Sequence, residues 1–421
     1  MFIAGGTNGK TTCLQCGCAA TTRRAVHLTS ISQYPTDPDF VQDPYPFYDS
    51  ARALGPLVFW SDYEMAATTT HAATSAILRD RRFGREVPSE LRGATPDHLA
   101  DFYALEAHSM LELEPPRHTR LRGLVLRAFT SRRIASLGPE IETLCHALID
   151  KMHRRDTDVL QTYCIPIPVI IIARLLGVPD SIAPDLLRWS NAMVSMYQAR
   201  RTPEIETAAT EAARDFAAFM RSYVEDRRST PADDLITQLI AAEQEGERLS
   251  TDELITTCIL LLNAGHEATV HSMGNGVKTL LEQGLTGNDL AAGNMAGIVE
   301  ELLRFDPPLH MFTRYCYETV ELFGHRFERG DQVACLLAAA GRDPAAYDDP
   351  IQFDPTRAGP PNVAFGAGIH FCVGAPLARL ELQIGLKTLF TRCPKLRLLD
   401  QPQYANLYHF HGLKSLNVTA Q

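Results

Sequence analysis

The sequence predicts a mainly α-helical chain with a few short strands, and three observations support this. Apolar residues recur at helical spacing along much of the chain, so we expect helices over residues 137–155, 159–176, 184–199, 204–228 and 251–283. Alternation over Leu57–Met65 favours a strand pair, and Ala66–Arg79 is predicted to form a helix. No apolar run reaches the roughly 18 residues that a membrane-spanning helix needs. These features are typical of a soluble, helix-rich enzyme.

Composition excludes several classes of protein. The net charge of −10 gives no reason to expect a nucleic-acid partner. Ten cysteines among 421 residues are too sparse for a disulfide scaffold, and the N-terminus lacks the pattern of a secretory signal. We therefore expect a cytoplasmic protein that does not associate with membranes.

Residues 1–33 differ in character from the rest of the chain. Gly5–Thr12 resembles the phosphate-binding turn of Mur-type ligases, but Ala4 stands where the general pattern has glycine and no nucleotide-binding domain follows. Cys13, Cys16 and Cys18 could bind a metal ion, although no fourth ligand lies nearby. We expect a flexible leader or a misplaced start codon, followed by a single domain over 34–421.

Two charged side chains share one face of a predicted helix after Pro115–Pro116. His118 and Arg122 stand four residues apart, so both could reach one anionic group. A solvated basic helix is the alternative interpretation.

The loop Phe365–Gly374, F-G-A-G-I-H-F-C-V-G, contains a single cysteine, Cys372. A helix is predicted directly after it, and a helix N-terminus favours a thiolate over a thiol. Gly366, Gly368 and Gly374 can adopt positive φ and let the backbone approach a flat, bulky ligand. A buried structural cysteine is the alternative.

This loop resembles the haem-binding signature of the cytochrome P450 family, F-G-x-G-x-H-x-C-x-G, and every fixed position is filled. The resemblance implies that Cys372 is the axial ligand of the iron in haem b (iron protoporphyrin IX). It also implies that His370 reaches a haem propionate and that Phe365 packs beneath the sulfur. The fold implied is the family's mainly α (α+β) fold, a triangular helical prism with small β-sheets.

Further segments resemble the family in the same order along the chain. By that resemblance His118, Arg122 and Arg314 bind the haem propionates. Glu301, Arg304 and Arg357 are expected to form a buried structural network rather than a catalytic one.

The long helix over 251–283 contains L-L-N-A-G-H-E-A-T-V-H, similar to the family's oxygen-activation segment, A-G-x-[DE]-T. Ala264 and Gly265 are small enough for porphyrin and dioxygen to approach, and Glu267 occupies the acid position. Ala268 stands where the family usually has a threonine whose hydroxyl helps protonate bound dioxygen. Thr269 lies one residue on, about 100° around the helix. Ordered water, a bulge that brings in Thr269, or a substrate hydroxyl could supply the missing contact.

The resemblance implies a monooxygenase that inserts one oxygen atom of O2 into a C–H bond of a medium-sized, largely apolar small molecule. Because no reductase domain is fused, electrons should come from a separate ferredoxin and an NAD(P)H-dependent ferredoxin reductase. We expect a monomer that attracts an acidic ferredoxin through several exposed arginines. A haem-thiolate sensor or carrier without turnover and a peroxide-driven variant are the alternatives. The arginines in question are Arg117, Arg120, Arg127, Arg132 and Arg133. The residues expected to line the substrate pocket are Leu261, Ala264, Leu309, His310, Met311 and Phe312, and by the resemblance the tip near Phe410–Leu413 of a C-terminal strand pair also borders it.

Overall fold

The computed structural model describes residues 28–153, 155–197, 201–242 and 248–420. The phosphate-loop-like turn and the Cys13–Cys18 cluster therefore lie outside the described residues. Strand β1 (Ser30–Ile31) pairs in parallel with β2 (Leu57–Trp60), and the Trp60 indole donates to the Gln33 carbonyl over 2.8 Å. Residues 30–33 thus belong to the folded unit, so the folded part begins before the expected boundary at 34.

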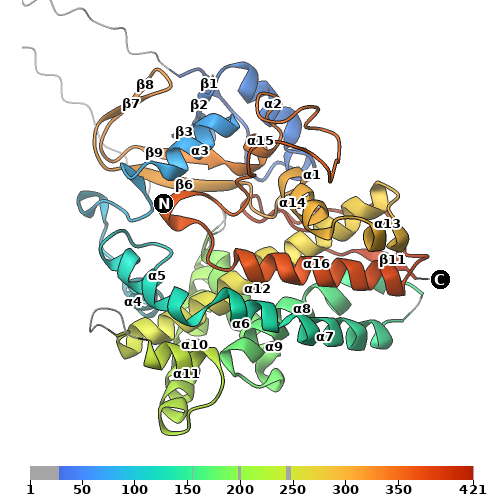
Figure 1. The fold of residues 1–421 in the computed structure, drawn as a ribbon. Helices are drawn as coiled ribbons and strands as arrows, with labels where there is room; N and C mark the ends of the chain where they lie inside the picture. The colour runs from blue at the N-terminus through green and yellow to red at the C-terminus, as the bar shows by residue number, and fades with distance from the viewer. Residues whose placement is uncertain (1–27, 154, 198–200, 243–247, 421) are drawn as a thin grey trace, which may run out of the picture.

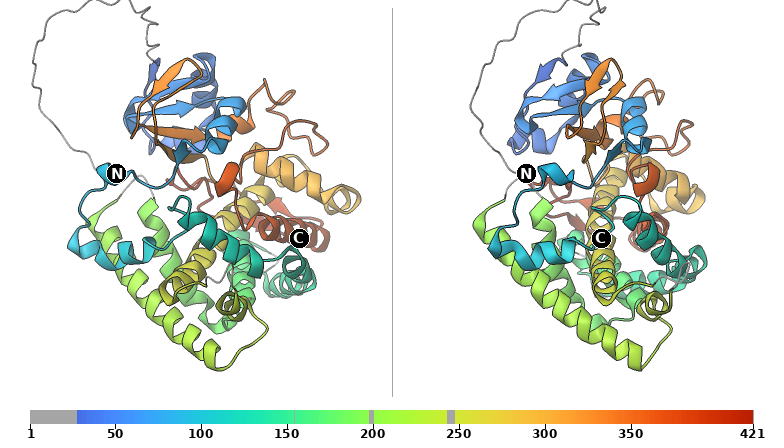
Figure 2. Two further views of the ribbon diagram at one scale, coloured as in Figure 1. Left: turned by 60° about the vertical axis from the view of Figure 1, so that its left-hand side comes forward. Right: turned by 90° about the vertical axis from the view of Figure 1, so that its left-hand side faces the viewer.

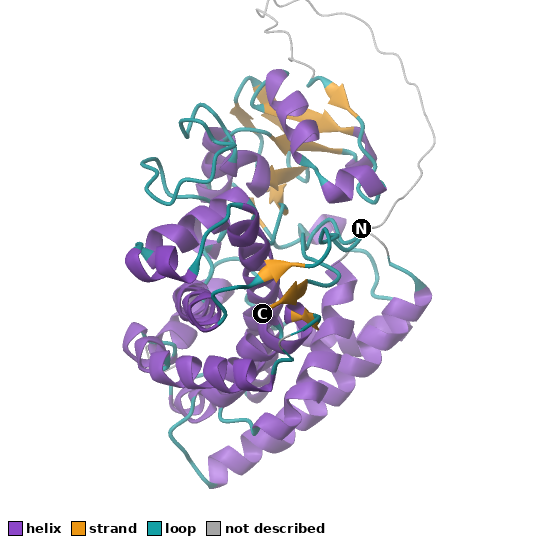
Figure 3. Ribbon diagram, turned by 90° about the vertical axis from the view of Figure 1, so that its right-hand side faces the viewer, coloured by secondary structure: helices purple, strands orange, loops and turns teal. Residues whose placement is uncertain are grey.

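One part of the molecule is built around a six-stranded sheet with the order β1-β2-β3-β9-β6-β4 (Figure 1). Two smaller sheets have the orders β10-β11-β5 and β7-β8. Figure 3 shows most strands at one end of the molecule and a smaller group beside the C-terminus, among the helices. The remaining strands are β3 (Met65–Thr68), β4 (Phe83–Gly84), β5 (Thr157–Asp158), β6 (Met311–Cys316), β7 (Val320–Leu322), β8 (His325–Phe327), β9 (Gln332–Leu336), β10 (Arg397–Leu398) and β11 (Asn417–Thr419).

Helices make up most of the other part (Figures 1 and 2). They are α1 (Pro38–Gln42), α2 (Tyr45–Ala53), α3 (His71–Arg79), α4 (Ala100–Glu106), α5 (Arg117–Ala128), α6 (Ser131–Ser136), α7 (Gly138–Lys151), α8 (Pro166–Leu176), α9 (Ala183–Val194), α10 (Pro203–Ser229), α11 (Leu235–Ala241), α12 (Thr251–Glu282), α13 (Gly287–Ala292), α14 (Met295–Phe305), α15 (Leu337–Gly341) and α16 (Ala375–Arg392).

Two predicted helices differ from the observed ones. The helix expected over Ala66–Arg79 is a strand, β3, followed by α3, because the Thr70 side chain caps a helix that begins only at His71. The helix expected over 159–176 is a π-helical turn, Leu160–Cys164, followed by α8. Pro166 starts α8, since a proline has no N–H to offer to a preceding turn.

Helix α12 runs through the middle of the helical part and contacts α8, α9, α10, α14 and α16 (Figure 2). A capping box starts it: the Ser250 hydroxyl accepts from the Glu253 amide, and the Glu253 carboxylate accepts from the Ser250 amide. Most of its side chains are buried. Its middle turns are therefore packed within the helical part of the molecule.

Glu301, Arg304 and Arg357 form a buried network, as the resemblance implied. Two Arg304 nitrogens donate to the Glu301 carboxylate over 2.7 Å each, and Arg357 Nε donates to the same group over 3.2 Å. Arg304 also donates to the carbonyls of Gly341 and Pro350. The network ties α14 to the loop that leads toward Cys372.

Among the described residues, no helix combines the length and the apolar character that crossing a membrane requires.

Candidate functional site

Backbone contacts shape the Cys372 loop. The Cys372 amide donates to the Phe365 carbonyl over 3.0 Å. Gly366 and Gly368 have φ of 70° and 72°, and a side chain at Gly368 would overlap the Leu78 carbonyl oxygen. Gly374 differs from expectation: its φ is −77°, so it is not a left-handed position.

Cys372 lies directly before the N-terminus of α16, as predicted, but its protonation differs from the prediction. Burial raises the pKa of the thiol above its ordinary value, and this outweighs the backbone N–H groups of Gly374 and Ala375, which lower it. Arg122 and Arg379 also lower the pKa. A metal ion at the sulfur would displace the proton.

His118, Arg122 and His370 gather beside the loop. The rings of His118 and His370 lie 4.4 Å apart, and Arg122 Nη2 donates to the Phe371 carbonyl over 2.6 Å. His118 is buried, and its Nδ1 has no hydrogen-bond partner. Burial, together with the neighbouring His370 and Arg122, lowers the pKa of His118 to about 4.

Arg314 is a buried cation with little compensation. It is 2% exposed, and its Nη1 donates to the carbonyl of Thr313. Burial lowers the pKa of Arg314 to about 10, and Arg85 nearby adds to that effect. Arg85 pairs with Glu112. An anionic ligand would restore the charge balance here.

Sequence reasoning missed Arg85 and Glu114 in this cluster. Glu114 accepts from the Arg85 amide over 2.7 Å and contacts His370 Nε2 over 2.8 Å. Glu114 begins the segment that contains His118, but nothing in its spacing marks it as a partner of His370. Arg85 follows a two-residue strand and carries no motif.

The middle of α12 presents small residues differently from the prediction. Ala264 is exposed although α12 crosses the interior of the molecule, which indicates open space beside it. Gly265 faces α8 instead: a side chain there would come within 3.2 Å of Ile172. Gly265 therefore allows two helices to approach each other, and Ala264 alone borders the open side.

Glu267 lies between two histidines of its own helix. Its carboxylate is 3.3 Å from His271 Nε2 and 3.4 Å from His266 Nε2. Burial would raise the pKa of Glu267, but the two imidazoles outweigh it and hold the pKa well below the ordinary range. The carboxylate is thus held ionised.

Thr269 does not replace the hydroxyl that Ala268 lacks. It is 4% exposed, and its Oγ1 donates to the Gly265 carbonyl over 3.2 Å. Helix α12 is α-helical throughout, without a bulge that would turn Thr269 toward the Ala264 side. Of the three sources that could supply the contact missing at Ala268, ordered water and a substrate hydroxyl therefore remain.

His271 is also crowded by the C-terminal loop. A side chain at Gly412 would overlap the His271 ring, and His271 Nδ1 has no hydrogen-bond partner. Sequence reasoning did not single out His271. Its spacing of four residues from Glu267 would have indicated the pair.

Glu381 is a second missed carboxyl group, on α16. It is 1% exposed, and neither carboxylate oxygen has a hydrogen-bond partner. Burial raises the pKa of Glu381 well above its ordinary value, so the group is held neutral.

These residues fit a haem. The buried unpartnered His118 Nδ1 and the weakly compensated Arg314 suit two propionates. Cys372 offers a thiolate donor, which haem iron accepts as an axial ligand. The exposed Ala264 on α12 would leave room for a flat ligand on that side of the helix.

Two expectations about neighbouring side chains need correction or refinement. His310 was expected as a polar contact in the substrate pocket, but it is 0% exposed and its Nδ1 contacts the Tyr48 hydroxyl over 2.9 Å. Phe365 lies in the loop as expected, and the Arg379 guanidinium stacks over its ring at 4.6 Å.

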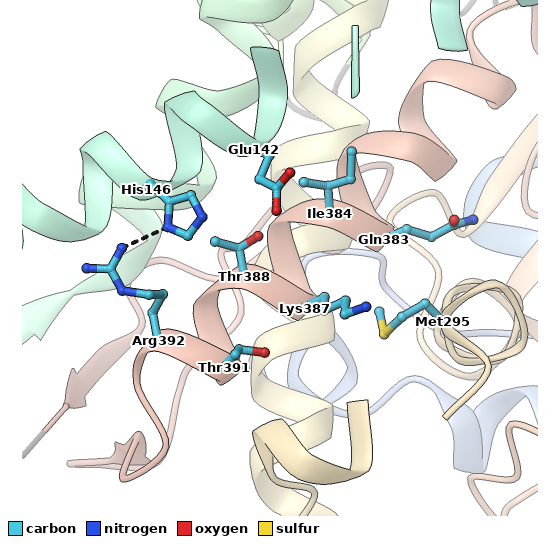
Figure 4. A pocket seen from close by; sticks show the side chains of 9 residues that line it. All are labelled: Glu142, His146, Met295, Gln383, Ile384, Lys387, Thr388, Thr391 and Arg392. Carbon is cyan, nitrogen blue, oxygen red and sulfur yellow. Dashed lines mark hydrogen bonds between the residues drawn. The ribbon is translucent and has the colours of Figure 1, made fainter. Parts of the chain in front are cut away.

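A separate surface groove of about 380 Å³ lies between α7 and α16 (Figure 4). His146 Nδ1 and Arg392 Nη1 contact each other across it over 2.7 Å, with Lys387 and Glu142 beside them. The groove is toward the C-terminal end of α16, away from Cys372, and is distinct from the site described above.

Comparisons with known proteins identify the family. The family model for "Cytochrome P450" matches residues 295–403. Cytochrome P450 monooxygenase PikC of Streptomyces venezuelae is 35% identical over 396 residues, which cover 90% of this chain and 92% of PikC. The biotin biosynthesis cytochrome P450 of Bacillus subtilis is 33% identical over 399 residues, covering 93% of this chain and 99% of the relative.

Solved structures agree with this. P450BioI in complex with hexadec-9Z-enoic acid ligated acyl carrier protein superposes with a TM-score of 0.85 at 34% identity, covering 91% of this chain and 99% of that one. The Bacillus subtilis polyketide synthase cytochrome P450 PksS gives a TM-score of 0.83 at 32% identity, covering 92% and 100%. The cysteine loop, the basic cluster and these similarities lead to one conclusion: the chain belongs to the cytochrome P450 family, as a haem b-dependent monooxygenase with the P450 fold.

Proposed function

We propose that this enzyme hydroxylates a C–H bond of a medium-sized, largely apolar small molecule, with Cys372 as the axial ligand of its haem. The observation that carries the proposal is the loop around Cys372 together with the buried basic cluster of His118, Arg122 and Arg314. When bound, the haem supplies the activation of dioxygen, and the protein supplies binding and orientation.

The chain's own residues divide the remaining work. The N–H groups of Gly374 and Ala375 stabilise negative charge on the Cys372 sulfur. His118, Arg122, His370 and Arg314 hold and orient the propionates. Glu267, held ionised beside His266 and His271 one helical turn after Ala264, supplies the fixed negative charge that would draw a proton toward this part of α12.

Apolar side chains support an apolar substrate. Of the residues expected to line the pocket, Leu261 and Met311 are buried in hydrophobic clusters, and Phe312 and Leu309 are partly buried beside one of them. The Ala268 position lacks a hydroxyl, so a substrate that carries a hydroxyl near the reacting carbon would complete the proton path with ordered water.

We further propose a separate ferredoxin and its NAD(P)H-dependent reductase as the electron source, with the enzyme acting as a monomer in the cytoplasm. Arg127 and Arg132, which are exposed on α5 and α6, are the proposed ferredoxin contacts. Arg120 and Arg133, also candidates from the sequence, instead pair with Glu253 and Asp233.

The reduced, carbon-monoxide-bound absorption spectrum tests the proposal. Wild-type protein should show the red-shifted Soret band of thiolate ligation, and Cys372→Ala should bind haem without that band. Cys393→Ala, at a buried cysteine on the far end of α16, is the matched control and should keep the band. Wild-type protein that binds haem without this band would refute the assignment of Cys372.

The absence of a hydroxyl at Ala268 favours keeping a haem-thiolate sensor without turnover as a second candidate. Substrate-dependent NADPH consumption with a surrogate ferredoxin pair separates the two. If NADPH consumption stays at the substrate-free rate with every ligand that shifts the Soret band, the result would support the sensor. Product formed with hydrogen peroxide alone, at the rate of the complete system, would support a peroxide-driven enzyme.

A further inference from the structure

A cluster of metal-ligand side chains lies buried at the end of α14, apart from the haem site. Asp306, His310 and His411 are 7%, 0% and 4% exposed, and one ligand atom from each lies within 4.8 Å of the others. His411 Nε2 is 3.5 Å from Asp306 Oδ1, and the two imidazole rings are 4.2 Å apart.

One nitrogen in this cluster has no use in the fold. His310 Nδ1 contacts the Tyr48 hydroxyl, whereas His310 Nε2 is buried without a hydrogen-bond partner. A buried polar atom without a partner costs about 1–3 kcal/mol, unless a ligand satisfies it. Its presence beside a carboxylate and a second imidazole points to a bound cation.

The surrounding side chains orient the three ligands. The Tyr404 hydroxyl donates to Asp306 Oδ2 over 2.5 Å, and the Tyr48 hydroxyl fixes the His310 ring. The Tyr404 ring stacks on His411 at 3.7 Å between centroids. Hydrogen bonds of this kind fix ligand orientation in metal sites, and they are present here without a metal.

We propose that Asp306, His310 and His411 bind a zinc ion. Two imidazoles and one carboxylate are a ligand set that zinc accepts, with a fourth position for water. Zinc–ligand bonds of about 2.0–2.2 Å require the three atoms to draw together by about 1 Å. The three ligands come from two segments, 306–310 and 404–413, which already contact each other.

The charged side chains around the cluster affect metal binding. Both imidazoles are buried, and Arg342 and Lys278 act electrostatically on the cluster. The charge of these two cations opposes a divalent ion, so the Asp306 carboxylate is essential to the site.

Such an ion would connect the C-terminal loop to the end of α14. The His411 amide donates to the Pro308 carbonyl, and Leu309 pairs with Phe410, so the loops already contact each other. Residues Phe410–Leu413 are those expected to border the substrate pocket. The ion would therefore fix the position of that pocket wall.

Equilibrium dialysis of the tag-free, haem-loaded full chain against zinc chloride, followed by elemental analysis, tests the proposal. Each haem-loaded chain holds one haem iron, so the Zn:Fe ratio gives the number of zinc ions per chain directly. His411→Gln and His310→Gln should each lower the ratio by about one zinc per chain relative to wild type. Zinc held elsewhere, for example by Cys13, Cys16 and Cys18, is common to all variants and cancels.

Two further variants make the test decisive. His98→Gln, at a histidine that pairs with Glu206 away from the cluster, should leave the ratio unchanged. Tyr404→Phe keeps all three ligands and removes only the hydrogen bond to Asp306, so it should weaken zinc binding by about 10-fold or more even if the ligand variants fail to fold. An unchanged ratio in His411→Gln, or unchanged affinity in Tyr404→Phe, would overturn the proposal.

Discussion

At the scale of single residues, the basic cluster of His118, Arg122 and Arg314 contains buried polar groups that other residues of the protein do not balance. Arg314 is buried with its own neighbour's carbonyl as an acceptor, and His118 keeps one ring nitrogen unpartnered. By contrast, Glu267 has two imidazole partners. The basic cluster is therefore prepared for an anionic ligand, whereas the acid of α12 is already satisfied and ionised.

Glu267→Gln tests the role of that acid. The amide keeps the size of the side chain but cannot carry a proton, so product formed per NADPH consumed should fall by about 10-fold or more. Peroxide-supported turnover needs no proton from Glu267 and should stay near the wild-type rate. Asp252→Asn, at an exposed acid of the same helix that pairs with Arg221, is the control. Equal losses in both reactions would indicate a structural role for Glu267.

Glu106 on α4 gives a prediction about pH. Burial raises the pKa of Glu106 to about 7, although the Tyr197 hydroxyl donates to it over 2.7 Å and opposes the shift. The folded state therefore binds this proton more tightly than the unfolded state, so the stabilisation is complete below about pH 4.5 and is lost as pH rises through about 7.

The urea midpoint of the haem-loaded enzyme measures this effect. Glu106 should contribute a loss of about 1–3 kcal/mol in the free energy of unfolding between pH 4.5 and pH 8. Glu106→Gln keeps the acceptor for Tyr197 and should remove that part of the pH dependence. If the midpoints of variant and wild type change in parallel over this range, Glu106 does not titrate as proposed.

At the scale of elements, α14 is connected to the loop before Cys372 by the Glu301 network. Glu301→Gln leaves the guanidinium groups of Arg304 and Arg357 buried without a counter-charge, and should cost about 3–5 kcal/mol. The yield and urea midpoint of haem-loaded protein measure the loss. Glu282→Gln breaks the solvent-facing pair with Lys278 and should cost less than about 0.5 kcal/mol. Similar effects of the two substitutions would contradict a structural role for the network.

Local sequence predicted some elements better than others. Helices α7, α10 and α12 were predicted to within a few residues because an apolar stripe marks each of them. Capping side chains also mark the starts of α10 and α12, and a proline marks the first turn of α7. Strand β3 was missed because Met65–Thr68 is buried on both sides and pairs with β9, more than 260 residues away in the chain, so it shows no alternation. Such long-range pairing leaves no periodic signal in the sequence.

At the scale of the whole molecule, partner recognition depends on which arginines are free of internal ion pairs. Arg127→Gln combined with Arg132→Gln should slow reduction by an acidic ferredoxin several-fold at low ionic strength. Raising the salt concentration should reduce the difference, because it screens exposed charges. Arg326→Gln, at an exposed arginine of β8, should leave the rate unchanged. A salt-independent rate in the wild type would refute electrostatic steering.

The sequence motif led to the proposed haem site but not to all the residues that gather there. Cys372, His370, His118 and Arg122 come together as the resemblance implied. Arg85, Glu114, His271 and Glu381 could not be found in the same way, because their importance follows from burial and from neighbours that only the folded chain brings close. Gly265 shows the opposite case, where a motif residue serves helix packing rather than the ligand.

The crowding of Gly412 against His271 has a consequence for the evolution of this enzyme. Any single mutation that gives residue 412 a side chain collides with the His271 ring, so the pocket wall cannot be altered there one step at a time. A smaller residue at 271 must come first, and that change also removes a partner of Glu267. The effect of a substitution at 412 therefore depends on the residue at 271. Libraries that vary 271 and 412 together should yield folded variants that libraries varying 412 alone do not contain.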